Sequence, residues 1–186
     1  VIYYPDWSCD DVAKVEHMTL VTGNHHLIFD FGGESAEAFN AAYVWDGGGT
    51  DALWSNGDNW SSNITPTSGD TVTFNNTCIT NCNPVISANT SVLGITMAAT
   101  YAGTITLNDG FTLTIGTSGF SQSAGTFIGG TGTTTTSGSF TISGGTFNAA
   151  STTEFTGNST TININVTQDF YDLVMNSNSI ASKTIT

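Results

Sequence analysis

The chain has 186 residues, enough for one sizeable domain or for a repeat array with a small appendage. Two Lys and no Arg stand against 15 Asp and Glu, giving a formal net charge of −13, which excludes a nucleic-acid partner because phosphate binding needs cationic side chains. Charged residues make up only 9% of the chain, so Thr, Ser, Asn and Gly must form most of the surface, as in secreted or cell-surface proteins. We therefore expect an extracellular or cell-surface location. No apolar run approaches the roughly 20 residues of a membrane span, and the start at Val1 without a signal peptide suggests a mature N-terminus or a fragment.

Residues 1–42 differ in composition from the rest and are expected to form a separate N-terminal extension. Residues 12–21 and 25–31 read as two strands around a Thr-Gly-Asn turn, which predicts a β hairpin, and residues 34–42 suggest a short helix. The three histidines of the chain fall here, but His25 and His26 are adjacent and would point to opposite sides of a strand, which disfavours a zinc site. We expect this extension to act as a subunit-docking segment.

Residues 43–83 form a Trp-rich segment followed by the first strands. Trp45, Trp54 and Trp60 are separated by turns rich in Gly, Asn and Asp. A solenoid exposes its core at each end and needs an atypical cap. Large rings with short loops suit that role, so this segment is expected to be an aromatic cap.

Residues 84–186 contain an internal repeat. Residues 120–139 and 140–159 both open with F-x-x-S-x-G-T-F, so that Phe120 corresponds to Phe140 and Phe127 to Phe147. A fixed period of this length is typical of a solenoid, in which each turn of the chain stacks on the previous one.

The repeat region alternates apolar residues with Thr, which places apolar side chains on one side of each strand and hydroxyls on the other. Between Thr71 and Thr161 only Asp109 and Glu154 are charged. Stacked like charges would repel along such a ladder, whereas Thr is tolerated. The sequence therefore predicts an all-β fold, a right-handed parallel β-solenoid.

The C-terminal segment, residues 161–186, continues this pattern. Ile162, Ile164 and Val166 alternate, and Phe170, Leu173 and Val174 read as core positions. The last residues have strand character and no polar cap, and an exposed strand edge is an aggregation hazard unless another chain covers it. We therefore expect a partner, most simply another copy of the chain.

Several motifs from residue 43 onward resemble a known class of proteins. They are W-D-G-G-G at 45–49, N-W at 59–60 and G-D-T-V-T-F at 69–74, followed by G-T-I-T-L, S-G-G-T-F and a closing F-Y-D-L-V-M strand. The pattern resembles the parallel β-helix repeats of autotransporter and filamentous-haemagglutinin-type surface adhesins, and other repeat-rich bacterial surface proteins. The resemblance covers about three quarters of the chain. It implies a structural or adhesive role and brings no catalytic residues.

The three cysteines leave one unpaired. Cys78 and Cys82 frame the loop CITNC and could close a local disulfide in an oxidising compartment, whereas a lone C-x3-C pair is a poor metal site. Cys9 then remains, either to pair with another chain or as a buried thiol.

Three further groups of residues are candidates for a functional site, and each can also be explained by a purely structural role. Asp46, Asp51 and Asp58 could supply oxygens to Ca²⁺ or the carboxylates of a glycosidase, although Asp beside Gly usually marks a turn. Trp54, Trp60 and Tyr101 could stack on a glycan, although Trp is more often core. N-glycosylation sequons, many of which arise by chance in a chain this rich in Asn and Thr, occur at Asn59, Asn63, Asn75, Asn89, Asn158 and Asn165.

These observations favour an extracellular structural protein, a filament or fibre subunit that joins head to tail with copies of itself through strand addition. The alternative is a β-helical adhesin or glycan-binding module of a larger surface protein. We expect no enzymatic activity, because lyases on this fold hold uronates with cationic groups and the only two here, Lys14 and Lys183, lie near the chain ends. No cofactor is expected apart from the possible Ca²⁺.

Overall fold

The computed structural model describes residues 17–21, 26–30, 40–158, 160–176 and 184–185. The chain divides into two compact units, Val1–Phe39 and Asn40–Thr186, and each is described by itself. Residues 34–39 of the expected short helix lie outside the described residues, and strand β3 begins at Ala42.

The N-terminal unit contains an antiparallel hairpin formed by β1 (His17–Val21) and β2 (His26–Asp30). His17 lies opposite Asp30 and Val21 opposite His26. The expected hairpin is therefore confirmed, while residues 12–16, 25 and 31 of the predicted strands lie outside the described residues.

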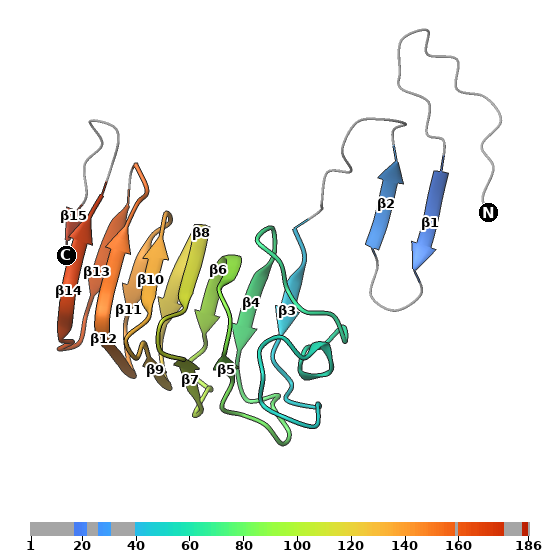
Figure 1. The fold of residues 1–186 in the computed structure, drawn as a ribbon, viewed down its shortest axis with the longest axis horizontal. Coiled ribbons are helices and arrows are strands. Elements are labelled where there is room, and N and C mark those ends of the chain that lie inside the picture. Colours follow the sequence, from blue (N-terminus) through green and yellow to red (C-terminus); the bar gives the residue numbers. More distant parts are fainter. Residues whose placement is uncertain (1–16, 22–25, 31–39, 159, 177–183, 186) are drawn as a thin grey trace, which may run out of the picture. The chain divides into compact units, whose positions relative to one another are not determined.

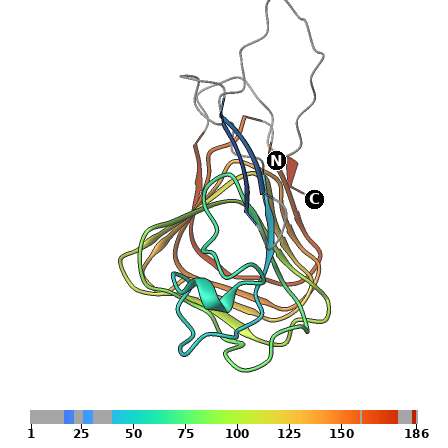
Figure 2. The same ribbon diagram turned by 90° about the vertical axis from the view of Figure 1, so that its right-hand side faces the viewer.

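The second unit is a β-solenoid of about five turns, whose strands stack side by side from β3 to β15 (Figure 1). Viewed along the stack, successive turns lie over one another (Figure 2). The pairings between its named strands are all parallel, as predicted. Each complete turn passes through three faces, because the long strands β6, β8 and β12 each bend from one face to the next.

Face 1 contains β3 (Ala42–Val44), β4 (Thr71–Phe74), the second half of β6 (Thr90–Met97), the second half of β8 (Thr112–Gln122), β11 (Phe140–Ile142), β13 (Thr161–Ile164) and β15 (Thr184–Ile185). Face 2 contains the first halves of β6 and β8, then β10 (Thr133–Thr136), the second half of β12 (Thr146–Phe155) and β14 (Phe170–Met175). Face 3 contains β5 (Val85–Ile86), β7 (Thr104–Leu107), β9 (Thr126–Ile128) and the first half of β12. A 3-10 helix, η1 (Gly57–Asn59), lies in the Trp-rich segment.

The repeat seen in the sequence is the stacking register of the coils. Phe120 pairs with Phe140 and their rings stack 4.9 Å apart, while Phe127 pairs with Phe147 with the same 4.9 Å between ring centroids. That distance is close to the separation of neighbouring strands, so identical side chains superpose from one coil to the next. Gly125 and Gly145 also correspond, with φ of 72° and 78°, a left-handed conformation that favours glycine at the corner.

The core runs through the coils as columns of apolar side chains. One column on face 1 passes through Val72, Ile95, Phe120, Phe140 and Ile162, all of which are buried. Such columns keep the interior continuous along the stack, as in other repeat proteins.

The hydroxyls do not all lie outside, contrary to the simple alternation expected from the sequence. Thr134, Thr136 and Thr153 are buried in columns that continue Leu113 and Ile115 on face 2. The run of four threonines at 133–136 has no alternation of apolar and polar residues that could show which side chains face the core. Because Thr has nearly the shape of Val, Thr134 and Thr136 fit the interior.

A single amide interrupts an apolar column of face 1. Gln122 lies between Met97 and Ile142 and is fully buried. Its Nε2 donates to the carbonyl oxygens of Gly125 and Thr146, each at 3.0 Å, which ties the corner of one coil to the next. These two hydrogen bonds offset part of the cost of burying the amide, whose Oε1 is buried and has no hydrogen-bond partner among the described residues.

Candidate functional site at the two ends of the solenoid

The end of the solenoid nearest β3, which we name the capped end, is closed by a ring cluster of Trp45, Trp54, Trp60 and Phe74. Ring centroids of Trp45 and Trp60 lie 4.9 Å apart, those of Trp54 and Trp60 4.8 Å apart, both edge to face, and Trp54 lies 5.7 Å from Phe74. Edge-to-face packing is a favoured arrangement of aromatic rings. The four residues are almost fully buried, so they form the expected cap.

Backbone carbonyls hold two of the three indole N–H groups of the capped end. Trp45 Nε1 donates to the Asn81 carbonyl oxygen at 2.7 Å, and Trp60 Nε1 donates to that of Trp54 at 2.9 Å. Trp54 Nε1 is buried and has no hydrogen-bond partner among the described residues. The cap therefore depends on the loop around Asn81 for its orientation.

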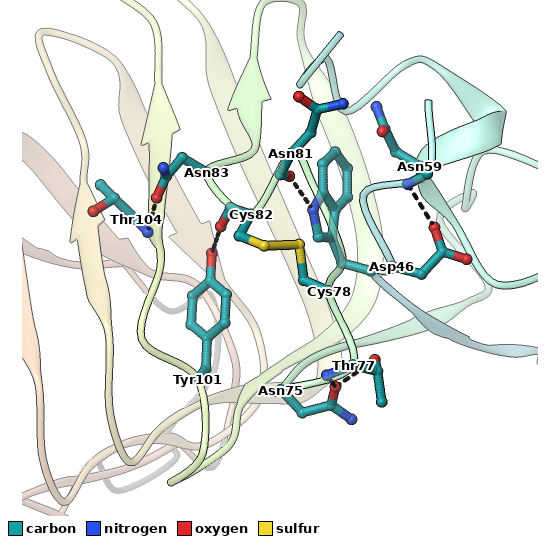
Figure 3. The surroundings of a disulfide bond; sticks show 12 residues. Asp46, Asn59, Asn75, Thr77, Cys78, Asn81, Cys82, Asn83, Tyr101 and Thr104 are labelled. Carbon is teal, nitrogen blue, oxygen red and sulfur yellow. Dashed lines mark hydrogen bonds between the residues drawn. A yellow bond between two sulfur atoms is a disulfide. The ribbon is translucent and has the colours of Figure 1, made fainter. Parts of the chain in front are cut away.

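That loop is closed by a disulfide between Cys78 and Cys82, as the sequence predicted (Figure 3). Asn81 Nδ2 donates to the Gly49 carbonyl oxygen at 2.7 Å, and Tyr101 Oη donates to the Cys82 carbonyl oxygen at 2.9 Å. The loop thus joins the Gly-rich turn after Trp45 to the first complete coil. Cys9 lies outside the described residues.

The loop also explains one glycine of the W-D-G-G-G motif. Gly47 has φ of +64°, and a Cβ added there would lie 2.8 Å from Cys78 Sγ. Both the left-handed conformation and the close approach of the disulfide require glycine at this position.

The proposed glycan-stacking residues all belong to the capped end and its support. Trp54 is 2% exposed, Trp60 0% and Tyr101 3%. Burial removes the ring faces that sugar stacking requires, because these rings pack on each other and on Phe74. Burial also raises the pKa of the Tyr101 hydroxyl well above its ordinary value.

Of the three aspartates proposed for Ca²⁺, Asp58 lies within η1, and Asp46 and Asp51 lie in the segment before it. Asp51 Oδ1 accepts from the Leu53 amide at 3.0 Å and from Asn56 Nδ2 at 3.1 Å, and these hydrogen bonds lower its pKa. Asp46 Oδ1 accepts from the Gly48 amide at 3.0 Å, and Asp58 is exposed. Among the described residues no cluster of three or more His, Cys, Asp or Glu could hold a metal ion. Calcium binding stays a prediction.

The six glycosylation sequons differ in accessibility. Asn59 is fully buried, its Oδ1 accepts from the Gly49 amide at 2.9 Å, and its Nδ2 donates to the Leu53 carbonyl at 3.0 Å, so it cannot accept a glycan in the folded chain. Asn75 is half-buried and its Oδ1 accepts from the Thr77 amide. The other four are exposed: Asn63, Asn89, Asn158 and Asn165.

The opposite end, which we name the open end, is formed by β14 on face 2 and by β15 on face 1. Leu173 and Met175 continue the inward columns of Thr153 and Phe155, yet they are 43% and 42% exposed. Tyr171 in the same strand is 83% exposed. In the part of the chain that the structure describes, β14 pairs only with β12. Inward-facing apolar side chains are therefore accessible at this end.

The sequence pattern identified this strand but not its exposure. Phe170 and Leu173 lie on inward columns as expected, whereas Val174 pairs with Glu154 and belongs to an outward column. An irregularity in register between Ala149 and Thr152 shifts the pattern, and no signal in the sequence marks it.

No helix in the described residues is long and apolar enough to cross a membrane. Comparison of the chain with protein-family models, with curated proteins and with solved structures gave no match.

Proposed function

We propose that this protein is an extracellular structural protein, the subunit of a surface filament that grows by head-to-tail addition of copies. The observation that carries the proposal is the difference between the two ends of one solenoid. The capped end buries its rings, and the open end presents Leu173 and Met175 beside a strand edge. A contact between two different surfaces extends into a fibre unless its rotation closes a ring.

The chemistry of the open end supports addition of strands. A strand edge presents N–H and C=O groups that another strand can pair with, and neighbouring apolar side chains add affinity. Both features are present at β14. An added strand would bury Leu173 and Met175 and continue the stacking of the coils.

The uncharged outward columns support stacking of coils along the axis of such a fibre. Thr73, Thr96, Ser121 and Thr141 succeed one another on the outside of face 1 without a charge. Uncharged columns avoid like-charge repulsion along the stack. The Cys78–Cys82 disulfide supports an extracellular location, because disulfides persist in oxidising compartments.

Electron microscopy of the purified full-length chain at neutral pH, without denaturant, tests this proposal. We expect long filaments with a regular axial repeat. Monodisperse single particles at every accessible protein concentration would contradict the filament and favour the alternative function.

The alternative is a β-helical adhesin module that binds glycans. The hydroxyls of the outward columns support it, since regularly spaced Thr and Ser can hydrogen bond to sugars. Binding of the immobilised protein to a glycan array, abolished by Thr114→Val and Thr135→Val together, would establish this role. We propose no catalytic role, and turnover of uronate polymers with or without Ca²⁺ would contradict that view.

A further inference from the structure

The turn that begins η1 contains the one Asn-Gly pair of the sequence, Asn56-Gly57. In an Asn-Gly pair the glycine amide nitrogen attacks the preceding carboxamide readily, because glycine has no side chain to hinder the approach. The attack closes a five-membered ring, and a nucleophile held in the same chain reacts far faster than one from solution. Both residues are half-buried, so water, the second reactant, reaches them.

The folded chain holds Asn56 in a conformation that does not react. Its ψ is 110°, which places Gly57 N on the far side of the Cα–C bond from Asn56 Cβ, whereas ring closure needs these two atoms on the same side. Both ends of the carboxamide are also held. Oδ1 accepts from the Asp58 amide at 3.1 Å, and Nδ2 donates to Asp51 Oδ1 at 3.1 Å. The attack therefore requires the turn to open first.

Opening of this turn involves the cap itself. The Asn59 amide donates to the Asn56 carbonyl oxygen at 3.2 Å, and the Trp60 amide donates to that of Gly57 at 2.9 Å. Rotation about the Cα–C bond of Asn56 moves both carbonyl groups and breaks these hydrogen bonds. Trp60 packs on Trp54 with 4.8 Å between ring centroids. Reaction at Asn56 is therefore coupled to loosening of the segment that carries Trp60.

We propose that Asn56 is a modification site, which deamidates to aspartate or isoaspartate when the turn around η1 opens. Gly57 N bonds to Asn56 Cγ, its proton passes through solvent to the departing Nδ2 group, and the Cγ–Nδ2 bond breaks to release ammonia. Water then opens the resulting succinimide at either carbonyl carbon, so the reaction consumes one water and needs no oxidant or reductant. This inference does not depend on the filament function.

The product weakens the capped end. A carboxylate at position 56 can only accept hydrogen bonds, so the donor to Asp51 is lost. The new negative charge also lies beside Asp51 and Asp58, and like charges repel. Isoaspartate adds one atom to the backbone between Trp54 and Trp60, where Trp60 Nε1 donates to the Trp54 carbonyl oxygen at 2.9 Å. Each conversion therefore makes the next opening of the cap easier.

Peptide mapping by mass spectrometry tests the site on the full-length chain incubated in mildly alkaline buffer. We expect aspartate and isoaspartate at position 56, formed about tenfold or more slowly in the native chain than in the same chain unfolded in urea, because only the open fraction reacts. Asp51→Ala removes the acceptor of Asn56 Nδ2 and should raise the native rate about fivefold, the effect of one hydrogen bond on the opening equilibrium.

Asp109→Ala is the matched control for Asp51→Ala. Asp109 Oδ1 likewise accepts from a backbone amide, that of Thr131 at 2.9 Å, but it lies between coils rather than in the Trp-rich segment. Its removal should leave the native rate at Asn56 unchanged. The comparison of native and unfolded chain needs no variant, so it decides the matter even where Asp51→Ala does not fold. Equal rates in the two states would overturn the control of Asn56 by the fold.

A second pair of variants tests the effect of the product. Asn56→Asp reproduces the new carboxylate, whereas Asn56→Ser keeps an oxygen that can cap η1 and adds no charge. We expect Asn56→Asp to unfold at a lower urea concentration than Asn56→Ser, with a difference that shrinks at high salt. Equal midpoints would show that the charge does not weaken the cap. Slower deamidation at Asn56 than at the other asparagines of the unfolded chain would overturn the site itself.

Discussion

Both ends of the solenoid have large apolar side chains, but these are buried at the capped end and partly exposed at the open end. At the capped end Trp45, Trp54 and Trp60 are covered by each other, by Phe74 and by a loop closed by a disulfide. At the open end Leu173 and Met175 have neighbours from the preceding coil and remain about two-fifths exposed. In a stacked fold, the contribution of a core side chain depends on whether another coil follows it.

This difference has an energetic meaning. Burial of apolar surface contributes about 25 cal/mol per Å². A covered ring therefore stabilises the folded chain, whereas an exposed apolar side chain contributes this free energy only when another surface covers it. The capped end supplies stability to the single molecule. In the proposed filament, burial of Leu173 and Met175 would supply free energy for association.

Truncation of one side chain at each end should separate these roles most strongly. Trp60→Ala removes a fully buried ring of the cap and should lower the free energy of unfolding by about 3 to 5 kcal/mol. Leu173→Ala, at the open end, should change it by less than about 1 kcal/mol in the single molecule. Urea unfolding followed by circular dichroism at low protein concentration measures both. Equal losses would show that the two ends are equally covered.

Removal of the disulfide should weaken only the capped end. Cys78→Ser with Cys82→Ser, in a Cys9→Ser background, opens a five-residue loop and should cost about 2 kcal/mol by the chain-entropy estimate. The loss should appear in near-ultraviolet circular dichroism of the Trp cluster, because the Asn81 carbonyl that binds Trp45 belongs to this loop. Reductant should reproduce the loss in the Cys9→Ser parent and have no effect on the triple variant. An unchanged urea midpoint would mean that the loop is held by its hydrogen bonds alone.

Alkaline pH should also act on the capped end. Burial raises the pKa of Tyr101 above its ordinary value of 10.0, so the unfolded chain ionises at lower pH than the folded one. The stabilisation is therefore complete below pH 10 and is lost as pH rises above it, by up to about 1.4 kcal/mol per pH unit. Tyr101→Phe loses the hydrogen bond to the Cys82 carbonyl, worth about 1 kcal/mol, but should show a shallower decline. Unfolding midpoints of the unsubstituted chain and of Tyr101→Phe, measured between pH 9 and pH 11, test this prediction. Equal declines in the two proteins would show that the Tyr101 hydroxyl is accessible.

Charge at the open end should have the smallest effect on stability and a large one on assembly. Leu173→Lys with Met175→Lys places two ammonium groups on side chains that are already partly exposed, so the free energy of unfolding should change by about 0.5 kcal/mol or less. Filaments should be absent in electron micrographs, because an unpaired buried charge is costly. Thr114→Lys, on an exposed outward position of a middle coil, is the control and should still assemble. Normal filaments from the double variant would place the contact elsewhere.

The sequence predicted the repeating part of the fold because each sequence repeat corresponds to one coil of the solenoid. The offset between Phe120 and Phe140 is the length of one coil, and the pairing of Phe127 with Phe147 follows from it. The Trp cap and the disulfide were also predictable. Each depends on residues that are close in sequence and whose types, Trp and Cys, have few alternative structural roles in such a pattern.

Other features depend on register that no local pattern records. The inward positions of Thr134 and Thr136 follow from pairing with Leu113 and Ile115, and a run of four threonines cannot show which two face the core. Gln122 reads as an outward residue until its column, between Met97 and Ile142, is known. The burial of Trp54, Trp60 and Tyr101 likewise depends on which rings meet in space rather than on sequence spacing.

The coil that begins at Phe120 repeats as a unit, because one offset of 20 residues relates both Phe120 to Phe140 and Phe127 to Phe147. Duplication of one such segment would insert a coil whose phenylalanines stack on identical neighbours, lengthening the body by about 4.8 Å. Neither the aromatic cap nor the last strand would be altered by that insertion. Each duplication within this region would therefore lengthen the solenoid by one strand spacing while leaving the Trp cluster and β14 unchanged.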